Sequence, residues 1–334
     1  MSRIKVNIWM TRKCNLACSY CYEGVEKEKA SINKKIIDSL IDYLLLVDKD
    51  LAIRFHGGEP LLEYELIKYF IGEIKRKNVN KRNITFHITT NGLLVTSNML
   101  EYLIRHMSDI SLSIDGGKEV NNMCRYNIKG QGSYDIVKEK SKLLLKYQPM
   151  TRARMTFTPD TVKYLVESVE HVVEMGFKVI VAIPDFYDKR WTEKEKELYK
   201  QAIEKLSILY KERNELCINL LDRTTLQKYS YCSGGECDIS VDTDGSFYPC
   251  TMAVGIGEYK IGDIETGVDE EKIKEFQNIS REVNPSCKGC VMLSYCSGNR
   301  CKIVNKIKTG IYTNPPVGVC MDQHVKYEMY NVMK

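Results

Sequence analysis

The chain lacks the features of a membrane-spanning or exported protein. It has no run of 18 or more apolar residues, which argues against a transmembrane helix. The segment from Met1 to Met10 lacks the long apolar core of a signal peptide. We therefore expect a soluble, cytoplasmic protein. With 334 residues, 43% of them hydrophobic, the chain can bury a large core, and we expect two domains.

The sequence also lacks a strong excess of charge of either sign. It has 49 lysines and arginines against 44 acidic residues, a mildly positive balance spread along the expected helices. The run Glu73, Lys75, Arg76 and Lys77 is typical of a solvated helix face and is only a weak sign of nucleic acid binding. We expect neither nucleic acid nor a membrane as a partner.

Histidine and cysteine are missing between Cys21 and His56, whereas Cys14, Cys18 and Cys21 stand close together. A closed structural zinc site would need a fourth ligand nearby. The spacing C-x3-C-x2-C suits an iron-sulfur cluster that keeps one metal corner without a protein ligand. A zinc loop or free thiols is the alternative. In a reducing compartment, thirteen cysteines indicate metal ligands rather than disulfides.

The first two thirds of the chain alternate between strand and helix patterns, which predicts an α/β fold. Ser31 and Thr161 are the expected N-caps of two helices, and a long charged helix is expected to begin near Thr192. Six βα units in series imply a parallel sheet with right-handed crossovers, either doubly wound or curled into a partial barrel. The expected strands, most of them apolar and rich in β-branched residues, are Arg3 to Trp9, Leu51 to Phe55, Ile84 to Thr89, Asp109 to Ile114, Arg152 to Phe157 and Phe177 to Ile183.

Polar, glycine-rich segments follow the first four expected strands, which favours the barrel because the strand ends of a βα barrel carry its active site. Gly57 and Gly58 allow the backbone to approach a ligand, and Glu59 offers an acceptor for an ammonium group. The alternative is an ordinary turn with a solvated Glu59. His56 is expected to be a packed residue rather than a base. The four segments are the loop with Cys14 after the first strand, His56-Gly57-Gly58-Glu59-Pro60 after the second, Thr89-Thr90-Asn91-Gly92 after the third and Ser113-Ile114-Asp115-Gly116 at the end of the fourth.

With Tyr20 just before Cys21, the cysteine loop resembles the signature of radical S-adenosylmethionine (SAM) enzymes. The resemblance implies a partial (β/α)6 barrel over residues 1–215, with Cys14, Cys18 and Cys21 as the catalytic cluster ligands and SAM chelating the open iron. It also implies that SAM is bound by Tyr20, Gly57, Gly58, Glu59, Ser113 and Arg125. Ser113 and Arg125 resemble the residues that hold the SAM carboxylate; a solvated loop residue is the alternative for Arg125.

Eight further cysteines fall in about a hundred residues of the C-terminal part, which indicates two four-ligand metal sites. Zinc is the alternative to iron-sulfur clusters at both sites. Asp244-Gly245 predicts a hairpin turn, whose second arm from Ser246 would deliver Cys250. The cysteines are Cys232, Cys237, Cys250, Cys287, Cys290, Cys296, Cys301 and Cys320.

The order of these cysteines resembles the SPASM domain, the C-terminal extension of radical SAM enzymes that mature peptides and proteins. The resemblance implies that residues 216–334 form this small domain together with a bridging segment. An inner cluster would use Cys232, Cys237, Cys250 and Cys301, and an outer cluster would use Cys287, Cys290, Cys296 and Cys320. Four residues separate Cys296 from Cys301 where the family usually has three. The cofactors implied are SAM and three 4Fe-4S clusters.

Cys124 and Cys217 belong to neither predicted set. Cys124, beside Arg125, is a candidate hydrogen-atom donor to a substrate radical. The alternative for both cysteines is a small buried hydrophobic residue.

The two resemblances together imply a 5′-deoxyadenosyl radical that acts on a peptide or protein side chain, with a flavodoxin or ferredoxin-type protein as electron donor. Anaerobic sulfatase maturases have an Asp directly after the hairpin cysteine, where this chain has Thr251. The departure favours a maturase of ribosomally made peptides that forms a thioether or carbon-carbon crosslink in a precursor peptide. A separate leader-binding protein presents that peptide, or the peptide adds to an exposed strand edge.

Four alternatives stay open for the function. They are a formylglycine-forming sulfatase maturase, a peptide epimerase, a small-molecule radical SAM enzyme of cofactor biosynthesis, and a metal-binding protein without catalysis. The Gly57-Gly58-Glu59 segment and the Ser113 and Arg125 pair disfavour the last of these.

Overall fold

The computed structural model describes residues 3–24, 28–222, 228 and 232–332. They pack into two compact units, the first made of Met1–Ser111 with Ser233–Glu275 and the second of Leu112–Cys232 with Phe276–Lys334. Packing thus divides the chain elsewhere than at the predicted boundary after residue 215. A functional boundary there stays a prediction, and part of its bridging segment lies outside the described residues.

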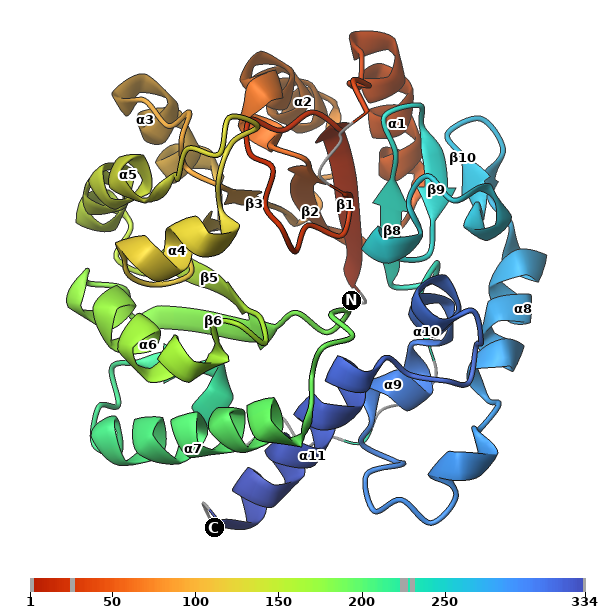
Figure 1. The fold of residues 1–334 in the computed structure, drawn as a ribbon. Helices are drawn as coiled ribbons and strands as arrows, with labels where there is room; N and C mark the ends of the chain where they lie inside the picture. Colours follow the sequence, from red (N-terminus) through yellow and green to blue (C-terminus); the bar gives the residue numbers. More distant parts are fainter. Residues whose placement is uncertain (1–2, 25–27, 223–227, 229–231, 333–334) are drawn as a thin grey trace. The chain divides into compact units, whose positions relative to one another are not determined.

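The first unit is built on a parallel sheet whose strands are joined by helices (Figure 1). Ser108 N, just before β4, donates to Phe86 O at 2.7 Å, so β4 begins beside β3. The strands are β1 (Arg3–Thr11), β2 (Asp50–Gly57), β3 (Ile84–Thr90) and the start of β4 (Asp109–Ser113), whose last two residues belong to the second unit. The connecting helices are α1 (Lys34–Leu46), α2 (Tyr64–Lys77) and α3 (Ser97–His106).

The core of this unit follows the predicted apolar pattern. Phe55 of β2 contacts Phe70 of α2 and Phe86 of β3, with ring centroids 5.6 Å and 6.2 Å apart. The N-cap prediction for α1 was wrong. Asn33 caps the helix by accepting from Ile36 N at 3.0 Å, because the Ser31 hydroxyl is bonded to Thr11 Oγ1 at 2.8 Å.

The cysteine-rich hairpin belongs to this same sheet. As predicted, the chain turns at Asp244-Gly245, where Gly245 has φ +89°. The pairing of β8 with β1 was not predicted: β8 runs parallel to β1 from Lys5 opposite Asp238 to Ile8 opposite Val241 (Figure 1). The added strands are β8 (Asp238–Val241), β9 (Ser246–Tyr248), β10 (Gly262–Asp263) and β11 (Gly267–Val268).

The second unit continues the strand and helix alternation. Its strands β5 and β6 are parallel, and the short β7 pairs with β6. Thr192 begins α7 as predicted, with its N–H donating to Glu195 Oε2 at 3.1 Å. Thr161 heads the 3-10 turn Val162–Tyr164 before α6 rather than the helix itself. The elements are α4 (Lys118–Cys124), α5 (Tyr134–Tyr147), β5 (Arg152–Phe157), α6 (Leu165–Glu174), β6 (Val179–Pro184), α7 (Glu193–Leu209) and β7 (Cys217–Ile218).

The C-terminal helices pack on α7 within this second unit. Tyr199 of α7 donates to the buried carboxylate of Asp322 on α11 at 3.1 Å, and Lys326 pairs with the same carboxylate at 2.7 Å. The helices are α9 (Ser297–Arg300), α10 (Lys302–Thr309) and α11 (Val317–Val332), while α8 (Glu270–Ser280) crosses from one unit to the other. All six predicted strands are present, with ends that differ by no more than two residues from the prediction.

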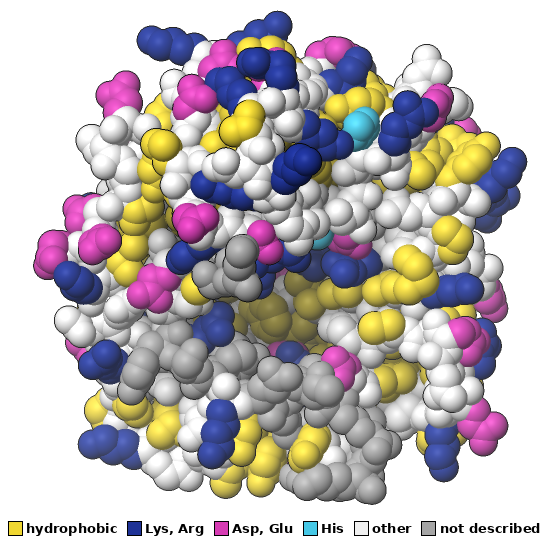
Figure 2. All heavy atoms as spheres, turned by 180° about the vertical axis from the view of Figure 1, so that it is seen from behind, with side chains coloured by type: hydrophobic (Ala, Val, Ile, Leu, Met, Phe, Trp, Pro, Cys, Tyr) yellow, Lys and Arg dark blue, Asp and Glu magenta, His cyan; other side chains and the backbone are white. Residues whose placement is uncertain are grey.

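The charged side chains are distributed as the composition predicts. On the face shown in Figure 2, basic side chains lie scattered among acidic and uncharged ones. On α2, Arg76 pairs with Glu73 at 2.6 Å, and Lys77 pairs with Asp42 of α1 at 2.7 Å. This part of α2 is the solvated helix face that the sequence predicted.

Candidate active site

The three cysteines predicted to hold a catalytic cluster lie on the loop after β1. Between them, Leu16 and Ala17 are only 3% and 1% exposed and anchor the loop in the protein. Cys14, Cys18 and Cys21 stay half-exposed. Cys21 N donates to Cys18 O at 3.1 Å, which closes a turn around the last two cysteines. Three accessible thiols on an anchored loop fit an iron-sulfur cluster with an open corner.

Gly57 and Gly58 let the end of β2 pack against the base of this loop. Gly57 has φ +111°, and a Cβ there would lie 2.1 Å from Thr11 O. A Cβ on Gly58 would lie 2.1 Å from Lys13 O. Glycine alone allows this approach. Gly58 N then donates to Thr11 O at 3.0 Å and Glu59 N to Lys13 O at 2.9 Å, which fixes the two segments together.

Three aromatic side chains, Trp9, Tyr20 and His56, belong to the same segments. The His56 ring stacks on Trp9 with centroids 4.6 Å apart, and its Nδ1 accepts from Gly57 N at 2.8 Å. His56 is therefore the packed residue that we predicted. Tyr20 is half-buried in the turn between Cys18 and Cys21.

The Glu59 carboxyl group is turned into the protein and is 1% exposed. Its Oε1 accepts from Leu61 N at 3.1 Å and from Thr90 Oγ1 at 2.8 Å, and its Oε2 accepts from Asn91 N at 2.8 Å. Burial raises the pKa of Glu59 to about 7, although these bonds act to lower it. The acceptor that the sequence assigned to an ammonium group is thus engaged within the protein.

Asn91, on the loop after β3, is a residue that the sequence did not single out for the site. Its side chain is 7% exposed, donates from Nδ2 to Asn15 Oδ1 at 2.7 Å, and places the same Nδ2 3.9 Å from Cys14 Sγ. Its Oδ1 accepts from Leu93 N at 3.1 Å. The only sequence signal was its place in the polar segment that follows β3.

Arg12 joins the start of the cysteine loop to the β8–β9 hairpin. Its Nε and Nη2 donate to the two carboxylate oxygens of Asp242 at 3.2 Å and 2.5 Å, with side chains only 14% and 9% exposed. Burial acts to lower the pKa of Arg12, but the bond to Asp242 and its charge raise the pKa overall. A Cβ on Gly255 would lie 2.5 Å from Arg12 Nη2, so the guanidinium lies against the Gly255 backbone.

The hairpin carries two of the predicted inner-cluster ligands. Cys237 N donates to Ser233 O at 3.1 Å in a tight turn before β8. Cys250 follows β9, and Thr251 begins the half-buried 3-10 turn Thr251–Ala253. A Cβ on Gly234 would lie 2.5 Å from Pro249 O, so the Cys237 turn packs against the segment that leads to Cys250. The predicted co-ligands Cys232 and Cys301 belong to the second unit.

The predicted SAM-carboxylate residues Ser113 and Arg125 also lie in the second unit. Arg125 is 7% exposed, and its Nε and Nη2 donate to Asp115 at 2.8 Å and 3.0 Å. Asp115 Oδ1 also accepts from Thr156 N at 2.8 Å, so this bidentate pair ties the end of β4 to β5. Ser113 is half-buried at the last position of β4.

The two unassigned cysteines differ in environment. Cys124 is the last residue of α4 and is 6% exposed, as expected for a small buried side chain. Cys217 lies in β7 and is exposed, so the buried alternative was wrong for this residue.

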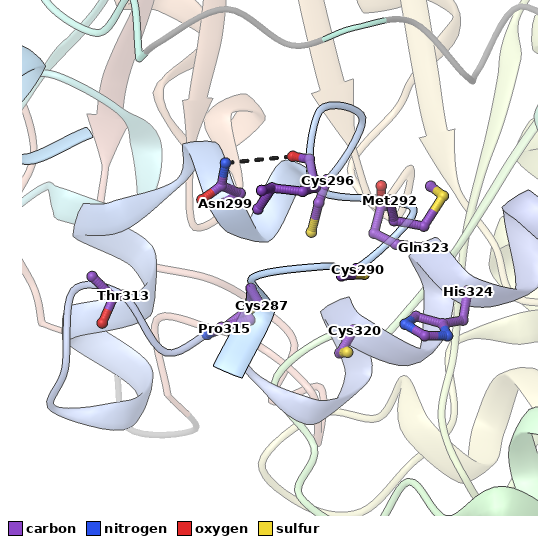
Figure 3. A pocket seen from close by; sticks show the side chains of 11 residues that line it. Cys287, Cys290, Met292, Cys296, Asn299, Thr313, Pro315, Cys320, Gln323 and His324 are labelled. Atoms are coloured by element: carbon purple, nitrogen blue, oxygen red, sulfur yellow. Dashed lines mark hydrogen bonds between the residues drawn. The ribbon is translucent and has the colours of Figure 1, made fainter. Parts of the chain in front are cut away.

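The four cysteines predicted for the outer cluster line a single cavity of the second unit. They come from separate segments: Cys287 ends a 3-10 turn, Cys290 and Cys296 lie on the loop before α9, and Cys320 lies on α11 (Figure 3). Burial raises the pKa of the Cys296 and Cys320 thiols, and the Cys287 and Cys290 thiols add to both shifts. Four soft donors around one cavity fit an iron-sulfur cluster.

Lys302, at the start of α10, is another residue that the sequence did not single out. It is 2% exposed, and its Nζ donates to Asn299 Oδ1 at 3.1 Å. Burial lowers the pKa of Lys302, while the nearby thiols of Cys287, Cys296 and Cys301 act to raise it. A buried ammonium group therefore lies among predicted ligands of both the inner and the outer cluster.

Among the described residues, no group of three or more His, Cys, Asp or Glu side chains is arranged around a single metal ion. A cluster separates its thiolate ligands by the width of its own core, so this finding concerns mononuclear sites. It gives no support to the zinc alternative.

Residues 8–202 match the family described as the Radical SAM superfamily, which is more than half of the chain. The chain belongs to the Radical SAM superfamily. Members bind SAM and a 4Fe-4S cluster, and the matched region includes the loop that carries Cys14, Cys18 and Cys21.

Relatives and solved structures extend the likeness to nearly the whole radical SAM chain. The cysteine-type anaerobic sulfatase-maturating enzyme of Clostridium perfringens (strain 13 / Type A) is 26% identical over 325 residues and covers 86% of each chain. The structure of native anSMEcpe with bound AdoMet and Kp18Cys peptide covers 99% of this chain and 97% of its own, with TM-score 0.84 and 22% identity. Streptococcus suis SuiB bound to precursor peptide SuiA covers 96% of this chain and 76% of its own, with TM-score 0.68 and 17% identity.

These likenesses confirm the predicted fold class, a partial (β/α)6 radical SAM barrel followed by a small SPASM-type cysteine-rich region with a β-hairpin. The part of this radical SAM chain that the structure describes contains no helix long and apolar enough to cross a membrane.

Proposed function

We propose that this radical SAM enzyme modifies a ribosomally made precursor peptide and forms a thioether or carbon-carbon crosslink between its side chains. The observation that carries this choice is Thr251, directly after Cys250, where the resemblance to sulfatase maturases calls for an Asp. A threonine hydroxyl is too weak a base to take the proton that formylglycine formation releases. Asp242, on the same hairpin, is bonded to Arg12 and Thr243 instead.

A peptide substrate is supported by two neighbours of similar fold. The anSMEcpe structure holds a Kp18Cys peptide, and the SuiB structure holds the precursor peptide SuiA. Both supports are compatible with a crosslinking maturase and with a sulfatase maturase, so our preference for the crosslinking maturase rests on Thr251.

In this proposal, Cys14, Cys18 and Cys21 hold the catalytic cluster and leave its open corner to SAM. When bound, SAM and the reduced cluster supply a 5′-deoxyadenosyl radical that removes a hydrogen atom from an unactivated carbon. Tyr20 and the backbone of Gly57, Gly58 and Glu59 are proposed for the amino end of SAM. Ser113 and Arg125 are proposed for its carboxylate. The remaining task of the protein is to hold the substrate carbon in place and to exclude water and oxygen.

Two auxiliary 4Fe-4S clusters complete the proposal, which makes three clusters in total. The inner one would be held by Cys232, Cys237, Cys250 and Cys301. The outer one would be held by Cys287, Cys290, Cys296 and Cys320, and the shared cavity of these four cysteines supports this set. Such clusters would accept the electron left after bond formation, so the net reaction is an oxidation. A flavodoxin or ferredoxin-type donor in the reducing cytoplasm would supply the first electron.

The second candidate function is formylglycine formation, and the likeness to the Clostridium perfringens sulfatase-maturating enzyme favours it. Peptide epimerisation is a third candidate, for which Cys124 and Cys217 are the thiols to test. A small-molecule radical SAM enzyme of cofactor biosynthesis would share every SAM-binding residue named above.

The deciding experiment offers anaerobically reconstituted protein two substrates. One is a sulfatase-type peptide, and the other is a candidate precursor peptide, sought as a short cysteine- or aromatic-rich reading frame beside this gene. We expect no aldehyde on the sulfatase peptide, and a loss of two hydrogens per crosslink in the mass spectrum of the precursor. Aldehyde captured by a hydrazine probe on the sulfatase peptide would refute the choice. Deuterium gained from heavy water without a mass loss would indicate epimerisation.

A matched set of cysteine variants tests the catalytic cluster. Cys14→Ala, Cys18→Ala and Cys21→Ala should each abolish 5′-deoxyadenosine formation, because no complete site would remain to bind and reduce SAM. Cys217→Ala is the control, since this exposed cysteine belongs to neither cluster set.

A further inference from the structure

The loops after β1, β2 and β3 meet at the buried carboxyl group of Glu59. Its backbone N–H donates to Lys13 O in the cysteine loop at 2.9 Å. Its side chain accepts from Thr90 Oγ1 and Asn91 N in the loop after β3, both at 2.8 Å. The third side-chain bond comes from Leu61 N at 3.1 Å. Every contact is local to one compact unit, and together they fix the position of Asn91 relative to the cysteine loop.

The Asn91 side chain uses its hydrogen-bonding capacity at this junction. Its oxygen accepts from Leu93 N at 3.1 Å, which fixes the orientation of the amide. Its nitrogen therefore faces the cysteine loop, where it donates to Asn15 Oδ1 at 2.7 Å and approaches Cys14 Sγ at 3.9 Å. With 7% of the residue exposed, little water competes for these contacts.

We propose that Asn91 is a positioning residue for the cluster ligand Cys14, and that the Glu59 carboxylate is the clamp that holds Asn91 in place. The amide N–H would stabilise negative charge on the Cys14 sulfur, and hydrogen bonds to cluster sulfurs are one of the means by which proteins set the reduction potential. The proposal rests on the assignment of Cys14 to the SAM-binding cluster.

This role replaces the direct contact between the Glu59 side chain and the SAM ammonium group that the sequence suggested. Three donors already occupy the carboxylate, and 1% exposure leaves it little access to a ligand. The backbone of the Gly57-Gly58-Glu59 turn still offers acceptors to SAM, so the two roles divide between backbone and side chain.

The test measures the reduction potential of the catalytic cluster in the absence of SAM, by electron paramagnetic resonance during a redox titration, together with the affinity for SAM. Auxiliary-cluster cysteines are replaced by Ala in every variant so that one signal remains. Asn91→Asp replaces the neutral amide by a negatively charged carboxylate, Asn91→Ala removes the amide donor, and Glu59→Gln places an amide opposite Asn91 N. Asn33→Asp is the control, because aspartate also accepts the capping bond from Ile36 N.

We expect Asn91→Asp and Asn91→Ala to shift the equilibrium between reduced and oxidised cluster about tenfold toward the oxidised form, which is ~59 mV for one electron. Glu59→Gln should shift the potential in the same direction by less, and the affinity for SAM should change by less than about threefold. The control should match the unsubstituted protein. If the Asn91 variants fail to assemble the cluster, the proposal is tested by the potential and SAM affinity of Glu59→Gln, which preserves the side-chain volume.

An unchanged SAM-free potential in the variants that assemble the cluster would overturn the proposal. So would a loss of SAM affinity of tenfold or more in Glu59→Gln at an unchanged potential, because that pattern is expected of a direct SAM ligand. Failure of the unsubstituted protein to modify any peptide would refute the proposed function but would leave this measurement intact.

Discussion

Breaking the buried ion pair between Arg12 and Asp242 should loosen the cysteine-rich hairpin from β1. Removing one partner of a buried pair typically costs about 3–5 kcal/mol, because the other charge stays buried. With side chains 14% and 9% exposed, Arg12→Met should cost about 3 kcal/mol, near the lower limit. Asp242→Asn keeps the volume and one acceptor, and Arg12 retains Glu28 at 3.3 Å, so about 2 kcal/mol is expected.

The assay is hydrogen exchange of the β8 backbone amides in the reconstituted protein, which reports local opening without complete unfolding. Exchange should accelerate about 150-fold in Arg12→Met and about 30-fold in Asp242→Asn, since each 1.4 kcal/mol is tenfold. The double variant should lose about 3 kcal/mol, less than the two single costs combined, because the pair is lost only once. Lys77→Met is the control, since its exposed pair with Asp42 should contribute under 1 kcal/mol. Additive effects, or unchanged exchange in β8, would refute this account of the hairpin.

Three further predictions concern the clusters and the Glu59 carboxyl group. Reconstituted protein should hold about 12 irons, and Cys287→Ala with Cys290→Ala about eight while 5′-deoxyadenosine still forms; stoichiometric zinc would count against the auxiliary clusters. Lys302→Met removes a buried positive charge and should lower the reduction potential of the outer cluster by ~59 mV, which is a tenfold change in the redox equilibrium. Lys306→Met is the control and should leave this potential unchanged, because the Lys306 Nζ donates to Gly310 O near the surface. The pKa of Glu59 is raised from 4.5 to about 7, so between these pH values the folded state holds a proton that the unfolded state has released. The free energy of unfolding should therefore decrease as the pH rises from 4.5 to 7, by up to about 3 kcal/mol. Glu59→Gln should remove this decrease from urea-denaturation curves measured across the same pH range.

The sequence predicted the strands well because each carries its own signal. Arg152–Phe157, which alternates polar and apolar residues, and the β-branched run Ile84–Thr90 are predicted from local pattern alone, and their observed ends agree with the prediction to within one residue. The N-cap at Ser31 failed for a tertiary reason. Its hydroxyl is bonded to Thr11, and no local pattern reveals that competition.

Parallel pairing of β8 with β1 could not be predicted from the sequence, since the strands are more than 200 residues apart and neither carries a local pattern that identifies its partner. One polar residue gave a hint. Asn7 is buried at 2% in the middle of β1, and its Nδ2 donates to Asp238 Oδ1 at 2.7 Å. A buried amide requires a partner, but chemistry does not say where along the chain that partner lies.

The site divides in the same way. Cysteine spacing identified the three thiols of the first loop, and cysteine order grouped four distant residues that prove to line one cavity. Arg12, Asn91 and Lys302 were missed because their partners, Asp242, Glu59 and Asn299, are chosen by packing. Ordinary residue types carry no sign of such a role until the fold brings the partners together.

The hypothesis that a precursor peptide adds to an exposed strand edge meets an obstacle in β6. Its outer edge pairs with β7 at Val179 and Ile180. Beyond that pair, the Asn219 side chain makes the two hydrogen bonds that a neighbouring strand would make. Its Oδ1 accepts from Ala182 N at 2.7 Å, and its Nδ2 donates to Ala182 O at 2.8 Å. A side-chain amide that occupies both backbone groups leaves an added strand no place to bind there.

Asn219→Ala should therefore expose the Ala182 N–H and C=O groups of β6, and we expect that the precursor peptide does not bind to them. Loss of two partly buried hydrogen bonds should cost about 1–2 kcal/mol, since water can reach an edge strand, and the Ala182 amide should exchange roughly tenfold faster. Asn299→Ala is not a suitable control because Asn299 lines the outer-cluster cavity, whereas Asn127→Ala removes a side chain bonded only within its own exposed loop. Fluorescence anisotropy with the precursor should give the same affinity for the unsubstituted protein, Asn219→Ala and Asn127→Ala. If the precursor binds markedly more tightly to Asn219→Ala alone, the peptide can bind at this edge of β6. Equal affinities favour the alternative that a separate protein presents the leader.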